Sequence, residues 1–266
     1  KECTDGGAAG AEVCYSGSLK KFSECKEVCD PKFQYDSSNC TGDKVLTGSS
    51  CGGKYEKCIE PLQYLYSDRT LSAEIIPGKS VIGIAVDPEN RLAVAIDYIM
   101  TTGWGGYGID IPTLENTPSS GAGIYVRGER DSYLIRDGKA NTAKILAYGR
   151  SNGISYPAAE AAYNYQPGSC SSSSWCGRGN WYLPSNWQVF PYFDNRATIH
   201  LMLKAINKMP DDWWYTRNDF YTVTSNEINA QESGFIYINT GGMAHGGKNL
   251  TEPDNLQTLV LPYITY

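Results

Sequence analysis

Residues 213–229 combine aromatic rings with amides and hydroxyls, a composition that suits non-covalent binding. They read WWYTRNDFYTVTSNEIN and hold two Trp, two Tyr, one Phe and three Asn, with only three charged residues. Tyr and Arg are enriched at interface hot spots, and Tyr covers a large area at low entropic cost. The alternative is that the rings are core aromatics beneath a loop. We expect both, with Trp213 and Phe220 buried and the Tyr and Asn side chains facing outward.

Cysteine is the other residue type with evident chemistry, and seven of the nine fall within the first 58 residues. Zinc sites favour C-x₂-C pairs with His nearby, whereas the closest pair here is Cys25-x₃-Cys29 with no neighbouring His. Disulfides are therefore favoured over zinc, which indicates an oxidising compartment outside the cytosol. The cysteines predicted to form disulfides are Cys14, Cys25, Cys29, Cys40, Cys51, Cys58, Cys170 and Cys176.

The pairing of these cysteines is only partly constrained. Cys170 and Cys176 flank SSSSW and most simply close a small loop. Seven is an odd number, so one N-terminal cysteine is free, pairs with a distant cysteine or pairs with another chain. Cys3 is the one that we leave without a partner.

No residue pattern predicts catalysis. The sequence holds only two His, and His200 falls in a predicted helix where a structural role is expected. The carboxylates of Asp211 and Asp212 are adjacent in sequence and should diverge. We expect a protein that is not an enzyme and that needs no metal or cofactor.

Length and charge limit the remaining classes of protein. With 266 residues and 41% hydrophobic residues, the chain can bury a substantial core. A net charge of −6 without a Lys/Arg stripe argues against nucleic acid as a partner. No run approaches the roughly 20 apolar residues of a membrane helix. Composition changes near residue 60, which predicts a disulfide-stapled module at 1–60 and a larger domain at 61–266.

The elements that must position the aromatic segment can be predicted from periodicity. Residues 80–97 form two strand-like runs around D-P-E-N, which predicts a hairpin. Residues 103–112, GWGGYGIDIP, predict a Gly-rich loop without the context of a nucleotide site. Helices are expected at 137–150, 155–165 and 195–209, and strands at 221–225, 234–239 and 256–266. The order predicts an α+β fold with an antiparallel sheet that unites strands from both ends of the domain.

Several motifs in this order resemble the C-type-lectin-like domains at the C-terminus of bacterial collagen-like adhesins, close to retroelement-diversified variable proteins. They are VIGIAVDPENRLAVAID, TTGWGGYGIDI, DGKANTAKILAYG, GNWYLPSNWQVFPYF, TSNE and GFIYINTGG. The resemblance covers about residues 80–266, and the N-terminal Cys-rich segment is similar to repeats that precede such domains. WYLPS at 181–185 matches the start of a helix in the family, whereas Leu261 stands where the family's closing strand has Arg.

The resemblance implies a ligand-facing surface at 213–250 that recognises a protein or a glycan. Its residues would be Tyr215, Arg217, Asn218, Tyr221, Asn226, Asn229, Tyr237, Asn239, His245 and Asn249. The protein would be secreted or displayed at the cell surface. In the alternative, the chain is a structural subunit of an extracellular filament or assembly, and the same face contacts sister subunits in a homo-oligomer.

Two further implications of the resemblance are weaker. Residues 252–254, Glu-Pro-Asp, look superficially like the calcium motif of sugar-binding lectins, but the partnering Trp-Asn-Asp signature is missing, so we expect a surface turn. Formylglycine-generating oxidases share the fold and use a redox Cys pair near the C-terminus. No Cys follows residue 176 here, which argues against that activity.

Overall fold

The computed structural model describes residues 62–101, 103–117, 137–208, 221–237, 243–249 and 258–266, and the backbone of short strands elsewhere. The chain divides into two compact units, Lys1–Pro61 and Leu62–Tyr266.

The first unit contains two small antiparallel sheets. One pairs β1 with β2, and the other has the order β3-β5-β4. The strands are β1 (Glu12–Tyr15), β2 (Ser18–Lys21), β3 (Phe33–Gln34), β4 (Val45–Ser50) and β5 (Tyr55–Ile59). The disulfides predicted for Cys14, Cys25, Cys29, Cys40, Cys51 and Cys58 concern side chains outside the described part of the chain.

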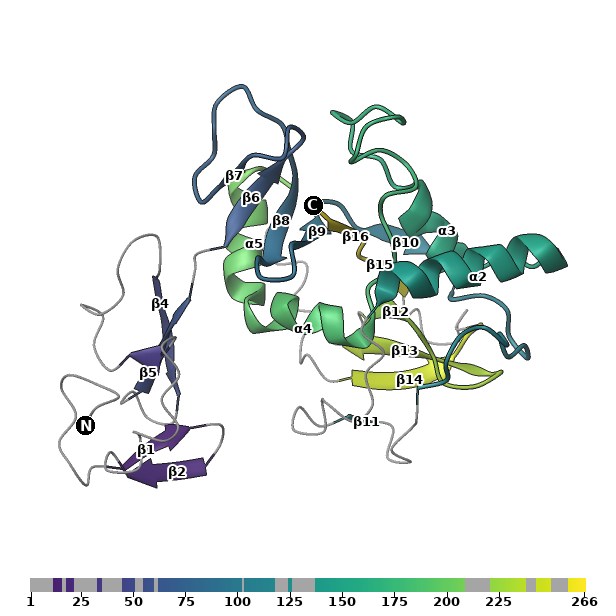
Figure 1. Cartoon of the computed structure of the whole chain (residues 1–266), viewed down its shortest axis with the longest axis horizontal. Coiled ribbons are helices and arrows are strands. Elements are labelled where there is room, and N and C mark those ends of the chain that lie inside the picture. Colours follow the sequence, from purple (N-terminus) through teal and green to yellow (C-terminus); the bar gives the residue numbers. More distant parts are fainter. Residues whose placement is uncertain are drawn as a thin grey trace. The chain divides into compact units, whose positions relative to one another are not determined.

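The second unit begins with a five-stranded antiparallel sheet in the order β16-β9-β8-β6-β7 (Figure 1). Its strands are β6 (Gln63–Tyr66), β7 (Leu71–Ser72), β8 (Val81–Asp87), β9 (Leu92–Ala95) and β16 (Tyr263–Thr265). The predicted hairpin at 80–97 is confirmed, because β8 and β9 pair antiparallel. Its turn is closed by Asp87, whose carboxylate accepts from the backbone N–H of Asn90 at 3.1 Å.

A six-stranded sheet has the order β10-β15-β12-β13-β14-β11. Its strands are β10 (Ile99–Thr101), β11 (Ile124–Tyr125), β12 (Tyr221–Glu227), β13 (Glu232–Tyr237), β14 (Met243–Gly247) and β15 (Thr258–Val260). All its ladders are antiparallel except the one between β12 and β15. The strand signal at 256–266 is divided at Pro262, so that β15 joins this sheet and β16 joins the other. Strands from both ends of the domain therefore share sheets, as predicted.

Four described helices complete the second unit: α2 (Gly138–Asn152), α3 (Pro157–Asn164), α4 (Asn186–Asp194) and α5 (Arg196–Ala205). The three predicted helices are confirmed as α2, α3 and α5. Asp137 caps α2, and Gly153 ends it in the left-handed conformation with φ of 65°. The WYLPS motif leads into α4, which Ser185 and Gln188 start with a capping box.

Helices cover both faces of the central strands in the six-stranded sheet. Successive strand residues alternate between the faces, so Val223 and Phe235 pack with α2 and α3 while Ile236 packs with α4. In the five-stranded sheet, one face joins the α4–α5 core, and the other packs against Trp181 and the disulfide between Cys170 and Cys176. That predicted disulfide is confirmed, with the two Cα atoms 5.7 Å apart.

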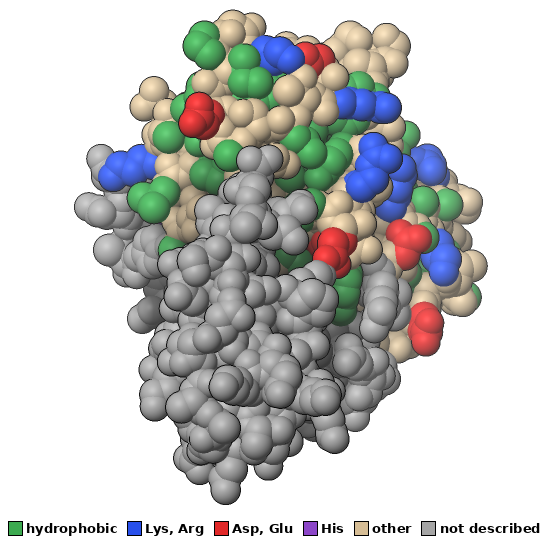
Figure 2. Space-filling view, turned by 60° about the vertical axis from the view of Figure 1, so that its left-hand side comes forward, with side chains coloured by type: hydrophobic (Ala, Val, Ile, Leu, Met, Phe, Trp, Pro, Cys, Tyr) green, Lys and Arg blue, Asp and Glu red, His purple; other side chains and the backbone are tan. Residues whose placement is uncertain are grey.

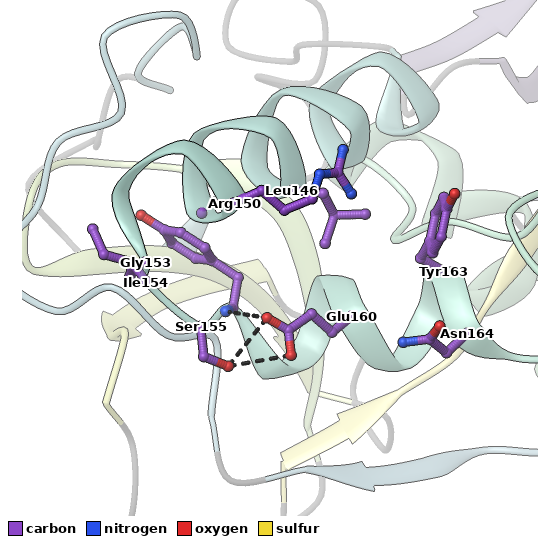
Figure 3. Close-up of a pocket in the computed structure, with 10 residues that line it drawn as sticks. Leu146, Arg150, Gly153, Ile154, Ser155, Glu160, Tyr163 and Asn164 are labelled. Carbon is purple, nitrogen blue, oxygen red and sulfur yellow. Dashed lines mark hydrogen bonds between the residues drawn. The ribbon is translucent and has the colours of Figure 1, made fainter.

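The described surface carries mixed charge and more than one pocket. Figure 2 shows a face on which Lys and Arg side chains gather on one side with Asp and Glu side chains nearby. A pocket of about 510 Å³ lies between α2 and α3 (Figure 3). None of the described helices has the length and apolar character needed to cross a bilayer.

Candidate functional site

The structure describes six of the ten residues predicted to face a ligand. Tyr215, Arg217, Asn218 and Asn239 lie outside the described residues, as do Trp213 and Phe220, which were expected to anchor the segment. The described six are Tyr221, Asn226, Asn229, Tyr237, His245 and Asn249.

The prediction that Tyr221 and Asn226 are exposed is wrong. Tyr221 is 1% exposed, and its ring centroid lies 4.7 Å from that of Phe235. Asn226 is fully buried; its Oδ1 accepts from the backbone N–H of Asn186 at 2.7 Å and its Nδ2 donates to Thr117 at 2.8 Å. The physical reason is that β12 is an inner strand whose two faces are both covered, so alternation leaves neither face to solvent.

The remaining residues lie on different parts of the sheet. Tyr237 shares a face with Phe235, with ring centroids 5.4 Å apart. His245 pairs with Gly234, so its side chain lies on the opposite face, where its Nδ1 is 3.1 Å from the Glu232 carboxylate. The described residues of 221–249 therefore do not form one continuous ligand-facing surface.

Asn229 and Asn249 each adjoin a residue that is hydrogen-bonded to the Gly-rich loop at 103–112. The backbone N–H of Gly108 donates to Ala230 at 2.8 Å, and the N–H groups of Trp104 and Gly105 both donate to the Lys248 carbonyl at 3.0 Å. Asn249 is exposed, whereas Asn229 uses its side chain to hold the turn through Gln231 and Glu232. We call Tyr107, Asn229 and Asn249 the loop end of the domain.

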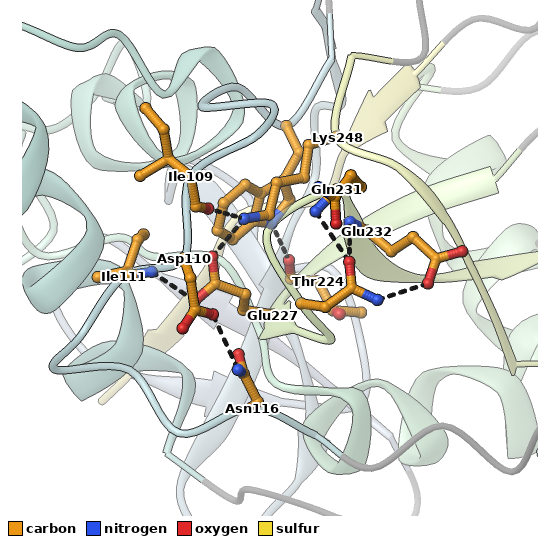
Figure 4. Close-up of polar contacts among 11 residues, drawn as sticks. Ile109, Asp110, Ile111, Asn116, Thr224, Glu227, Gln231, Glu232 and Lys248 are labelled. Atoms are coloured by element: carbon orange, nitrogen blue, oxygen red, sulfur yellow. Dashed lines mark hydrogen bonds and ion pairs between the residues drawn. The ribbon is translucent and has the colours of Figure 1, made fainter.

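A buried ion pair holds the backbone of this loop on its inner side (Figure 4). Lys248 Nζ pairs with Glu227 Oε1, and both side chains are fully buried. The same ammonium donates to the Ile109 carbonyl at 2.5 Å, and Glu227 Oε2 accepts from the Ile111 N–H at 3.1 Å. Lys248 thus bonds to the backbone carbonyl before Asp110, and Glu227 bonds to the backbone N–H after it.

Trp104 adds a second attachment. Its indole N–H donates to the Thr224 carbonyl at 2.8 Å, and the Lys248 ammonium lies 5.0 Å from its ring centroid. Its ring also meets Tyr156 edge-on, with centroids 5.5 Å apart. The loop is therefore tied to β12, to the turn after β14 and to the residue before α3.

Burial and the ion pair shift the pKa of each of the two buried groups in opposite directions. Burial raises the pKa of the Glu227 carboxyl, and the hydrogen bond and charge of Lys248 lower it. Burial lowers the pKa of the Lys248 ammonium, and Glu227 raises it. Each charge is held in the interior by the other, so loss of either leaves an uncompensated buried charge.

Because the loop is held in place, Tyr107 is presented to solvent in a fixed position on the backbone. Tyr107 is 55% exposed between Gly106 and Gly108, whose φ values are 63° and 82°. These left-handed conformations suit glycine and let the chain turn tightly around Tyr107. A fixed, exposed Tyr loses little entropy on binding. Chemically, the loop end offers a ligand the exposed Tyr107 ring and the exposed Asn249 beside the loop.

Sequence reasoning missed this arrangement because it read 103–112 only as a loop. Glu227 was noticed as part of TSNE, but nothing in the sequence linked it to Lys248. A Glu that ends a strand of otherwise uncharged residues was the available signal, since buried carboxylates require a partner. Within the described residues, no group of three His, Cys, Asp or Glu side chains comes together as a metal site.

Comparisons with known proteins identify a likeness of fold. No family model matches the chain, and no curated protein matches it. A crystal structure of a fimbrial protein from Bacteroides ovatus ATCC 8483 superposes with a TM-score of 0.51 at 12% identity. The two chains share a fold. The match covers 88% of this chain and 61% of the fimbrial protein, so this chain spans less than two thirds of its neighbour's length.

Proposed function

We propose that this chain is a non-enzymatic component of an extracellular surface appendage and binds a protein or glycan without a cofactor. The observation that carries the proposal is the likeness of fold to a fimbrial protein along 88% of the chain. The disulfide between Cys170 and Cys176 supports it, because such bonds persist in oxidising compartments outside the cytosol.

Within this proposal, the loop end is the contact surface. Tyr107 supplies an exposed ring on a loop that is already ordered, and Asn249 lies next to that loop. Residues 213–220 and Asn239, predicted from the resemblance to C-type-lectin-like domains, remain further candidates. We also propose that the Leu62–Tyr266 unit is a C-type-lectin-like domain, supported by the WYLPS motif that precedes α4 and by the pairing of β16 with β9.

The second candidate is a structural subunit, favoured by the neighbour's description as a fimbrial protein. The same surface would then contact sister subunits in a homo-oligomer. The two candidates differ in where the protein should be found on an appendage: along its length for a structural subunit, and at restricted positions such as its tip for a binding component.

Immunogold electron microscopy on intact cells that carry the gene tests the location. Labelling of appendages without permeabilisation is the expected result, and its distribution separates the two candidates. Labelling only after permeabilisation would overturn the proposal of an extracellular role.

Binding is tested with the purified chain on glycan and extracellular-protein arrays. The Tyr107→Ala/Asn249→Ala variant should lose most of any signal, because a central aromatic anchor is typically worth about 2 kcal/mol or more. Ile75→Ala is the matched control, since Ile75 is also exposed but lies outside the loop end. Equal binding by the loop-end variant and the control would exclude the loop end as the contact surface.

A further inference from the structure

The pocket between α2 and α3 has the size and the mixed lining of a ligand site, and it is separate from the loop end. Its volume of about 510 Å³ falls within the range of small-molecule sites. Leu146 and Ile154 supply apolar lining, while Arg150, Tyr163 and Asn164 supply polar groups (Figure 3).

Arg150 is the cation of this pocket. It lies in the last turn of α2 and is exposed, and no carboxylate of the described residues forms an ion pair with it. A guanidinium presents several N–H donors in a planar fork that matches a carboxylate. Because the whole chain carries a net charge of −6, an anion would be drawn here by a local cation and not by the overall field.

Tyr163 supplies a supported ring. The backbone N–H of Gly179 donates to the Tyr163 carbonyl at 2.8 Å. A Cβ built on Gly179 would lie 3.3 Å from Cζ and the hydroxyl oxygen of Tyr163, so the ring rests against this glycine. The ring is 38% exposed and lines the pocket. An aromatic surface held in place is suited to cover the C–H face of a sugar ring.

Glu160 is the carboxylate that lines the pocket. Its carboxylate accepts from the Ser155 hydroxyl at 3.1 Å and from the Tyr156 N–H at 3.0 Å. A carboxylate oxygen has room for more than one donor, so a ligand hydroxyl could donate to it. A ligand rich in negative charge would be repelled by Glu160, whereas a ligand with one carboxylate and several hydroxyls satisfies both Arg150 and Glu160.

We propose that this pocket binds a sugar that carries a single carboxylate. The carboxylate pairs with the Arg150 guanidinium, the C–H face of the ring stacks on Tyr163, and the hydroxyls bond to Asn164 and Glu160. The apolar lining from Leu146 and Ile154 receives the less polar edge of the sugar. The inference does not depend on the loop end or on the location of the protein.

Titration calorimetry of the full chain with D-glucuronate and with D-glucose tests the proposal. We expect saturable binding of glucuronate in the millimolar range, as for a small polar ligand, and at least about tenfold weaker binding of glucose. Arg150→Gln should weaken glucuronate binding at least about tenfold, because it removes a charge-assisted pair. Tyr163→Ala should weaken the binding of glucuronate as well.

Lys144→Gln is the matched control, since Lys144 is an exposed cation of the same helix that does not line the pocket. It should leave glucuronate binding unchanged. Three results would each overturn the proposal: no saturation with glucuronate, an equal loss in the Lys144 and Arg150 variants, or saturable binding of a short Asp/Glu peptide in place of glucuronate. The circular dichroism spectrum of each variant should match that of the parent chain.

Discussion

Lys248 and Glu227 form an ion pair in which neither side chain reaches solvent. Lys248 follows β14 and Glu227 ends β12, so the pair connects two segments of the sheet and, through Ile109 and Ile111, the loop that carries Tyr107. The strength of this ion pair is tested by substituting Lys248 alone and then Lys248 together with Glu227.

Lys248→Met should lower the free energy of unfolding by about 3–5 kcal/mol, because the Glu227 carboxylate would remain buried without its partner. Urea denaturation followed by circular dichroism measures the change. The double variant Lys248→Met/Glu227→Gln should recover part of the loss, because it removes the uncompensated charge. A double variant as unstable as the sum of the two single variants would show that the pair has no coupling.

Gly105 should tolerate no side chain. A Cβ at this position would lie 2.6 Å from the Ser155 carbonyl oxygen and 2.7 Å from Pro157 Cδ, and the residue has φ of 100°. Gly105→Ala should therefore cost about 2 kcal/mol or more, through strain and steric overlap. Gly108→Ala is the control, since its φ is 82° but nothing lies within 4 Å of the added Cβ. Its cost should be about 1 kcal/mol, and equal effects at the two sites would contradict the described packing.

Tyr156 should contribute to a loss of stability at high pH. Burial and the charge of Glu227 raise its pKa from 10.0 to about 12 in the folded chain. The unfolded chain releases this proton near pH 10, so above that pH the folded state binds more protons and its stability falls until about pH 12. Tyr156→Phe should flatten this decline in thermal denaturation, and a decline as steep as that of the parent chain would contradict the prediction.

The disulfide between Cys170 and Cys176 should contribute about 2 kcal/mol, because it closes a short loop and removes little entropy from the unfolded chain. The Cys170→Ser/Cys176→Ser variant, measured in the same urea experiment, isolates this bond from the other cysteines. Trp175 fluorescence should also change, since its indole N–H donates to Ser67 from within the loop. An unchanged midpoint would mean that the loop is held by its hydrogen bonds alone.

Local signals in the sequence predicted the elements well. The helix predicted at 137–150 is confirmed as α2, although its caps are Asp137 and Gly153, and the hairpin predicted around D-P-E-N is confirmed by the pairing of β8 with β9. The small loop between Cys170 and Cys176 followed from spacing alone. In each case the deciding interaction joins residues close together in the chain.

Exposure was less predictable because it depends on which strands become neighbours. YTVTSNE ends in four polar residues, which would be expected to face solvent, yet β12 is an inner strand and all seven residues are buried. Asn226 and Thr224 are accommodated by partners such as Asn186, 38 or more positions away. The pairing of Lys248 with Glu227 likewise depends on topology, which no local pattern encodes.

The division of the last strand at Pro262 affects the order in which the domain can be built. β15 and β16 complete different sheets, and their partners β10 and β9 lie more than 150 positions earlier. A chain emerging from the ribosome would thus lack a strand of each sheet until its final nine described residues, 258–266, are available. Such long-range closure is slow, so a nascent chain would keep these two sheets incomplete until that last segment is synthesised.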